Sequence, residues 1–194
     1  VTNDVTQEAS DVEEFDLTVP VLKECTMELS KTSMTVDPEA EGSLTATLAN
    51  AGNSDWSVSM AKTGSRAAGV DYDGASSGIL PYDDGDGTKT FDLTVTPDDS
   101  VTAGDESVIV ILAKDGNTVK CSKDLRVIVG QSFGAGLSLS TTMLSDIEPG
   151  SSGLATLTIT NQGNGMDNLR ISASAPPSGW SVQLDASTVS VGSK

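Results

Sequence analysis

Histidine is absent from this 194-residue sequence, and cysteine occurs only twice. Without an imidazole, Ser-His-Asp and Cys-His catalysis are excluded, and so is the commonest protein ligand for a metal ion. Two cysteines alone do not build a structural zinc site. The sequence also lacks a Gly-Lys-Ser/Thr phosphate loop and a dinucleotide fingerprint. We therefore expect a protein that is not an enzyme and has no catalytic or cofactor-binding residues.

Basic residues are scarce too. The chain carries 11 Lys and Arg against 28 Asp and Glu, so its formal net charge is −17 at pH 7. Such a surface repels nucleic acid and anionic lipid, and no run approaches the roughly 18 consecutive apolar residues of a membrane span. We therefore expect no nucleic-acid partner and no membrane insertion. The acidic excess resembles that of proteins in salty water, an archaeal-like trait, because counter-ions there screen the repulsion.

Aromatic residues make up only 4% of the chain, so its core must be built mainly from aliphatic side chains. Residues 42–50 and 88–95 alternate apolar with polar side chains, which is the period of a strand with one buried face. The apolar run 107–113 predicts a central strand, and a Lys-Asp-Gly-Asn turn predicts a hairpin into a strand over 118–129. Short strands with turn signals between them predict an all-β fold of antiparallel immunoglobulin-like sandwiches.

One stretch of the sequence occurs twice. DPEAEGSLTATLANAGN (residues 37–53) returns as EPGSSGLATLTITNQGN (residues 148–164). The offset of about 111 residues is close to the size of one immunoglobulin-like domain, and it predicts two tandem domains. We place the first domain at 22–130, a linker of small residues at 131–136 and the second domain at 137–194. On this alignment the second domain lacks C-terminal strands in this chain.

A shorter repeat precedes the first domain. FDLTVPV (residues 15–21) nearly matches FDLTVTP (residues 91–97), so residues 1–21 are interpreted as an acidic tail plus a spare strand. Three explanations stay open: the chain is a segment of a longer array, the strand of one copy completes the next copy, or the second domain closes by itself. The candidate strand-exchange side chains are Phe15, Leu17, Val19 and Val21.

One acidic loop region is a candidate metal site. It contains Asp71-x-Asp73-Gly and Asp84-x-Asp86-Gly, and calcium favours oxygen ligands at alternate positions with a Gly that allows a sharp turn. Neither motif continues to a Glu at position twelve, so two solvated turns are the alternative interpretation. Calcium is the only cofactor that these residues favour.

The two tryptophans, Trp56 and Trp180, also have two interpretations. An exposed indole ring stacks on the sugar rings of a glycan, whereas a tryptophan in a sandwich commonly packs between the sheets. We expect both to lie in the core. Tyr72 and Tyr82 flank the acidic loop region, and we expect them to be exposed.

The Asn-Gly turns and the motif Pro-x-Gly-Trp-x-Val resemble the immunoglobulin-like domains found beside glycoside hydrolases (NPCBM-associated, alpha-galactosidase-linked). The chain is also similar to the CARDB cell-adhesion-related modules of archaeal and bacterial surface proteins. Trp56 departs from the pattern, because it follows an Asn-Gly turn with no Pro-x-Gly before it. The resemblance implies an immunoglobulin-like fold and an extracellular setting. The matching residues are Pro97, Ala103, Gly104, Asn161, Gly163, Pro177, Gly179, Trp180 and Val182.

The resemblance also bears on the cysteines. Cys25 opens the first strand of the first domain and Cys121 lies in its last strand, and such strands can lie side by side in immunoglobulin-like sandwiches. A Cys25–Cys121 disulfide is then expected, with two buried thiols as the alternative. A disulfide would place the protein outside a reducing cytosol.

These expectations lead to a non-enzymatic structural protein of the extracellular space or cell surface, such as an S-layer or other coat, a spacer or a filament subunit. It would assemble through contacts between β-domains and strands, with identical chains or other domains of a longer chain as partners. The alternative function is a glycan- or calcium-dependent adhesion module attached to a larger secreted enzyme.

Overall fold

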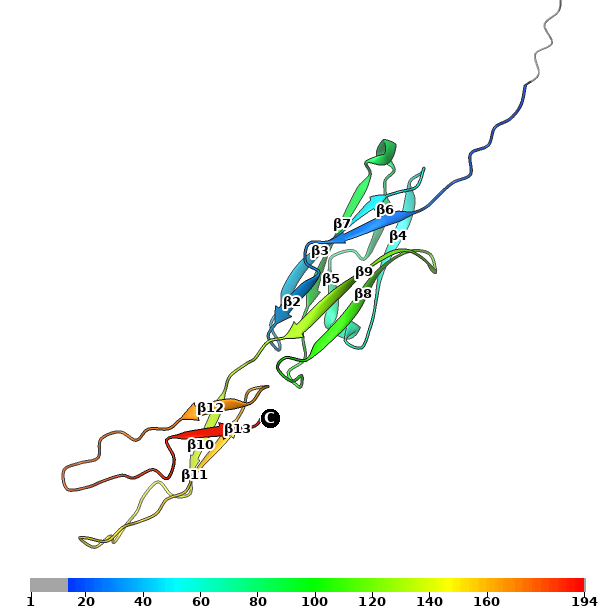
Figure 1. The fold of residues 1–194 in the computed structure, drawn as a ribbon. Coiled ribbons are helices and arrows are strands. Elements are labelled where there is room, and N and C mark those ends of the chain that lie inside the picture. The colour runs from blue at the N-terminus through cyan, green and yellow to red at the C-terminus, as the bar shows by residue number, and fades with distance from the viewer. Residues whose placement is uncertain (1–13, 194) are drawn as a thin grey trace, which may run out of the picture.

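Two β-sheets packed face to face take up residues 25–129, which we call the sandwich (Figure 1). The structure is a computed structural model that describes residues 14–193. One sheet has the strand order β1-β3-β7-β5 and the other has the order β2-β9-β8-β4-β6. The strands of the sandwich are β1 (Cys25–Leu29), β2 (Ser33–Val36), β3 (Gly42–Asn50), β4 (Trp56–Thr63), β5 (Val70–Asp73), β6 (Ser77–Leu80), β7 (Thr88–Val95), β8 (Glu106–Asp115) and β9 (Thr118–Val129), with 3-10 turns η1 (Ala67–Gly69) and η2 (Asp83–Gly85).

The core of the sandwich follows the predicted alternation of apolar residues. β3 and β7 pair antiparallel, and each buries every second side chain between the sheets because successive residues of a strand point to opposite faces. The all-β, immunoglobulin-like sandwich predicted from this pattern is therefore confirmed, but it is not wholly antiparallel, because β2 pairs with β9 in parallel. The fully buried residues of the two strands include Leu44, Ala46, Leu48, Phe91, Leu93 and Val95.

β8 is a central strand of its sheet, as predicted, and it forms a hairpin with β9. The turn contains Gly116 at a φ of 58°, a left-handed conformation that favours glycine. The strand is apolar on both faces, but only one face lies in the core, and Val108 is half exposed on the outer face. No described segment covers that face, so the second set of apolar residues on β8 faces outward.

The predicted Cys25–Cys121 disulfide is present, with a distance of 5.6 Å between the two Cα atoms. Cys25 lies in β1 and Cys121 in β9, and these strands belong to different sheets. The bond therefore ties one sheet of the sandwich to the other near the beginning and the end of its chain.

The C-terminal segment, residues 130–193, repeats four strands of the first half of the sandwich, β1, β3, β4 and β6. It contains β10 (Ala135–Leu139), β11 (Leu157–Asn161), β12 (Asp167–Arg170) and β13 (Thr188–Val191). β10 pairs with β11 as β1 pairs with β3, and β12 pairs with β13 as β4 pairs with β6. Matching residues are offset by about 111 positions, the offset of the sequence repeat.

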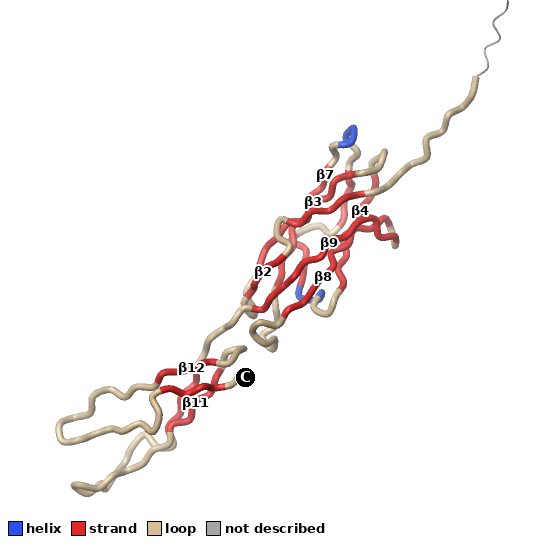
Figure 2. The backbone as a smooth tube through the Cα atoms, viewed as in Figure 1, coloured by secondary structure: helices blue, strands red, loops and turns tan. Residues whose placement is uncertain are grey.

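Two strands of the first half of the sandwich, β2 and β5, have no strand counterpart in the C-terminal segment. β2 pairs with β9 and β5 pairs with β7, and the described residues contain no second copy of these partners. Figure 2 accordingly shows long loops in this segment. Many of its apolar side chains lie exposed, and they include Leu137, Leu139, Met143, Leu154, Trp180 and Val182. The division into domains at 22–130 and 137–194 stays a prediction.

The leading segment, residues 14–24, extends away from the end of the sandwich opposite to the C-terminal segment (Figure 1). It forms no strand with other described residues, so the predicted spare strand over 15–21 has no pairing partner here. The side chains of Phe15, Leu17, Val19 and Val21 are all strongly exposed. Residues 1–13 of the predicted tail lie outside the described residues. Within residues 14–193, no helix is long and apolar enough to span a membrane.

Candidate functional site: the junction between the sandwich and the C-terminal segment

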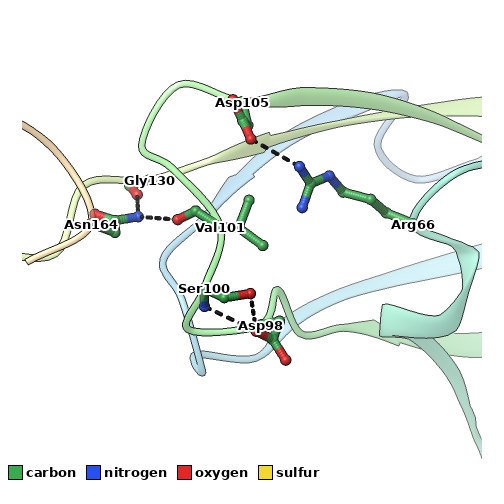
Figure 3. Close-up of polar contacts among 7 residues, drawn as sticks. All are labelled: Arg66, Asp98, Ser100, Val101, Asp105, Gly130 and Asn164. Atoms are coloured by element: carbon green, nitrogen blue, oxygen red, sulfur yellow. Dashed lines mark hydrogen bonds and ion pairs between the residues drawn. The ribbon is translucent and has the colours of Figure 1, made fainter. Parts of the chain in front are cut away.

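The side chain of Asn164, in the C-terminal segment, forms hydrogen bonds that connect this segment to the sandwich (Figure 3). Its Nδ2 donates to the carbonyl oxygen of Val101 at 3.1 Å and to that of Gly130 at 2.9 Å. Its Oδ1 accepts from the backbone N–H of Ser132 at 2.8 Å. The backbone carbonyl of Asn164 accepts from the N–H of Ala103 at 2.9 Å. We call this set of contacts the clasp.

The clasp connects three separate stretches of backbone. Val101 and Ala103 belong to the loop between β7 and β8, Gly130 and Ser132 follow β9, and Asn164 lies in the turn between β11 and β12. The Asn164 side chain is buried, with 8% exposure. Because a buried amide must be hydrogen-bonded to avoid a desolvation cost, these contacts are specific for this relative position of the chain segments.

A glycine permits the close approach that the clasp requires. A Cβ on Gly163 would lie 2.3 Å from the carbonyl oxygen of Ser132, which is backbone and cannot move aside without displacing the connection. The same holds at the other end of the sandwich, where a Cβ on Gly52 would lie 2.0 Å from the carbonyl oxygen of Leu22. The two glycines of the repeated Asn-x-Gly-Asn motif thus have the same structural role.

The first asparagine of each Asn-x-Gly-Asn motif forms hydrogen bonds from one sheet to a strand of another sheet. Asn161 Nδ2 donates to the carbonyl oxygens of Gly165 and Val191, at 2.7 and 3.2 Å, and its Oδ1 accepts from the N–H of Gly163 at 2.8 Å. Asn50 makes the corresponding bonds in the sandwich, to Ser54, Leu80, Pro81 and Gly52. Because β3 and β6 lie in different sheets, the Asn50 amide bridges them.

The loop that meets Asn164 is itself held in place by polar contacts. Asp98 accepts hydrogen bonds from the hydroxyl of Ser100 at 2.6 Å and from its backbone N–H at 2.9 Å, which hold the pKa of Asp98 below its ordinary value. Asp105 forms an ion pair with Arg66 at 2.9 Å. Figure 3 shows both contacts beside the clasp. The loop therefore presents its backbone to Asn164 in a fixed conformation.

The Asp98 contact predicts a pH dependence. Because the pKa of Asp98 is lower in the folded chain than in the unfolded chain, its stabilising contribution is present above the unfolded pKa, about 3.9. It is lost as pH falls through the lowered pKa. We expect the amide resonance of Ser100 to shift in that acidic range in an NMR titration. The variant Asp98→Asn retains an acceptor oxygen but does not titrate, so the same shift in this variant would contradict the assignment.

A cavity of about 540 Å³ opens beside this loop. Val101, Ile109 and Val127 contribute apolar walls where the ends of the two sheets meet. The guanidinium of Arg66 also lines the cavity, but it is already paired with Asp105. The cavity thus combines apolar walls with the carboxylates of Glu39, Asp98 and Asp99, and its one basic side chain is paired with Asp105.

The predicted calcium ligands lie in two separate places. Asp71 and Asp73 belong to β5, where Asp71 pairs with Lys62 at 3.0 Å and Asp73 lies opposite Asp92 of β7. Asp84 and Asp86 lie in and just after η2, before β7 begins. Among residues 14–193 no group of three or more His, Cys, Asp or Glu side chains could hold a metal ion. The structure does not bring the four aspartates together, and calcium binding stays a prediction.

The aromatic residues differ from one another in burial. Trp56 lies in the core with 3% exposure, as expected, but Trp180 is 59% exposed, because it lies in the long loop between β12 and β13, outside the two short sheets of the C-terminal segment. Tyr72 is half-buried rather than exposed, and burial raises the pKa of its hydroxyl to about 12. Asn53 and Asn164 are the last residues of the two copies of the sequence repeat. This repeat is the sequence signal from which the clasp could have been identified.

No protein-family model and no curated protein matches the chain. A solved structure similar to it is the ASH / PapD-like domain of human CEP192 (PapD-like domain 7), at 12% sequence identity and a TM-score of 0.36. The match covers 64% of this chain and 95% of that chain.

Proposed function

We propose that this chain is a non-enzymatic structural protein of the cell exterior, a spacer or coat component in which immunoglobulin-like units follow one another in a fixed orientation. The observation that carries the proposal is the clasp. Asn164 hydrogen-bonds to the sandwich through Val101 and to the connecting backbone through Gly130 and Ser132. A connection containing Gly130 and Gly134 would be flexible by itself, so the clasp stiffens the junction.

Two further features support an extracellular role. The Cys25–Cys121 disulfide is of the kind that persists in oxidising compartments. The net charge of −17 keeps such a chain soluble where salt screens its self-repulsion. Contacts with identical chains belong to the same proposal, because the leading segment and the C-terminal segment both present apolar side chains to solvent.

Replacing Asn164 by Ala tests the proposal. The substitution leaves the carbonyl oxygens of Val101 and Gly130 without the amide donor, and we expect a loss of about 1–3 kcal/mol in the stability of the junction. Residual dipolar couplings measured by NMR should fit one alignment tensor for the sandwich and the C-terminal segment in the original chain. The variant should require two tensors.

Asn117→Ala is the matched control, because Asn117 is an exposed asparagine in the β8–β9 turn. It should leave the couplings on a single tensor. If the original chain already requires two tensors, the junction is flexible and the proposed spacer function is wrong.

A further inference from the structure

The front end of the sandwich carries a second copy of the clasp. Asn53 occupies the position that matches Asn164 in the repeat. Its Oδ1 accepts from the N–H of Leu22 at 2.7 Å, and its Nδ2 donates to the carbonyl oxygen of Pro20 at 2.9 Å. These contacts match those of Asn164 with Ser132 and Gly130. Asn53 therefore holds the leading segment as Asn164 holds the chain that leaves β9.

The leading segment also matches the strand that precedes the clasp at the other end. In the register set by the two asparagines, Phe15-x-Leu17-x-Val19 corresponds to Leu125-x-Val127-x-Val129, the end of β9. In β9 the three apolar side chains are buried in the sandwich, with exposures of 0 to 4%, whereas Phe15, Leu17 and Val19 are 68 to 85% exposed. The same alternating pattern thus faces a core in one place and solvent in the other.

We propose that the Asn53 end of the sandwich is a docking surface for another β-sandwich of the same kind, joined in the same polypeptide, whose last strand ends with residues 14–19. This inference rests on the proposed spacer function and deepens it by naming the partner. Residues 14–19 complete the neighbouring sandwich as the end of β9 completes this one, and the backbone then passes through residues 20–22, which hydrogen-bond to Asn53.

The missing contacts of Asn53 define what the partner supplies. Asn164 is buried because the Val101–Ala103 loop covers it, contributing a carbonyl acceptor for Nδ2 and an N–H donor for the Asn164 carbonyl. Asn53 is exposed, and among residues 14–193 no loop covers it in this way. The partner sandwich therefore presents a loop equivalent to 101–103 next to Asn53.

Proline at position 20 restricts how the partner pairs with this strand. Pro20 matches Gly130, the residue after β9, whose N–H donates to the carbonyl oxygen of Val36 at 2.8 Å. Proline has no N–H to donate to a neighbouring strand. The partner sandwich therefore lacks this one bond to its own equivalent of β2 at Pro20.

A chain with an added sandwich tests the inference. Residues 23–123 are fused directly in front of Glu14, so that residues 14–19 follow Lys123 in the place of residues 124–129. We expect hydrogen exchange at the backbone amides of 16–22 to slow by roughly 100-fold or more relative to the original chain, as for strands in a folded core. Asn53→Ala in the fused chain should retain this protection but require separate alignment tensors for the two sandwiches.

Three outcomes overturn the inference. The first is an added sandwich that forms its own disulfide while residues 16–22 stay unprotected. The second is protection only after Pro20→Gly, which would show that the natural residue at the end of this strand does not fit. The third is a dimer of the original chain that protects 16–22 in sedimentation and exchange experiments, which would assign the strand to a second copy. None of these results changes the single-tensor test of the Asn164 junction, so failure of the spacer function is recognised separately.

Discussion

Removing the Cys25–Cys121 disulfide is expected to lower the free energy of unfolding by about 4.7 kcal/mol, the value for a closed loop of about 100 residues. The two cysteines are 96 positions apart, so the bond restricts nearly the whole unfolded sandwich. It also joins β1 of one sheet to β9 of the other. The sandwich should still fold without it, because its core continues through both sheets.

Urea unfolding of the double variant Cys25→Ala, Cys121→Ala against the original chain measures this effect. Adding a reductant to the original chain should reproduce most of the loss, and adding it to the double variant should change nothing. A loss below about 1 kcal/mol would mean that the bond adds little to the constraint already imposed by packing, contrary to the chain-entropy account.

Alternation of apolar and polar residues predicted the sandwich well, because successive side chains of a strand point to opposite faces of its sheet. Leu44, Leu48 and Leu93 stand at every second position of their strands, and each is buried between the sheets. The Gly116 turn and the hairpin after it were equally readable, because few residues other than glycine adopt a positive φ easily. The disulfide was also expected, although only the resemblance to immunoglobulin-like domains suggested the pairing.

Features that depend on distant partners were not readable from local patterns. Trp180 was expected in a core, but burial requires a second sheet, and the C-terminal segment pairs its strands only in twos. The outer face of β8 is also apolar, but Val108 is half exposed there because no described segment packs on that face. The clasp was missed because an asparagine in a turn has many local uses. Only the fold shows that Asn164 reaches the loop before β8.

The two asparagines of each motif have separate tasks, and this separation explains why the motif recurs. Asn50 and Asn161 satisfy carbonyl groups inside one unit, so they would be needed in any single copy. Asn53 and Asn164 contact the backbone that enters the unit, so they are useful only where units follow one another. A repeat that preserves both positions therefore favours a chain built for end-to-end stacking over a single binding module.

Replacing Trp56 by Ala is expected to destabilise the sandwich by about 3–5 kcal/mol, as for other large aromatic side chains removed from a core. Trp56 begins β4 opposite Leu80 of β6, and its ring is 3% exposed. Its Nε1 is buried without a hydrogen-bond partner, so this N–H adds a desolvation cost rather than stability. The stabilisation from Trp56 therefore comes from the apolar area and packing of the ring.

Urea unfolding of two matched variants tests whether the stabilisation by Trp56 comes from the packing of its ring. Trp56→Phe keeps an aromatic ring and removes the unpaired N–H, so it should cost much less than Trp56→Ala. Trp180→Ala removes the same side chain from a site that is 59% exposed and should have little effect on the sandwich. A Trp56→Ala variant that is nearly as stable as the original chain but loses affinity for a glycan would instead favour a binding module. Equal losses for Phe and Ala at position 56 would show that the indole N–H, and not packing, stabilises the native state.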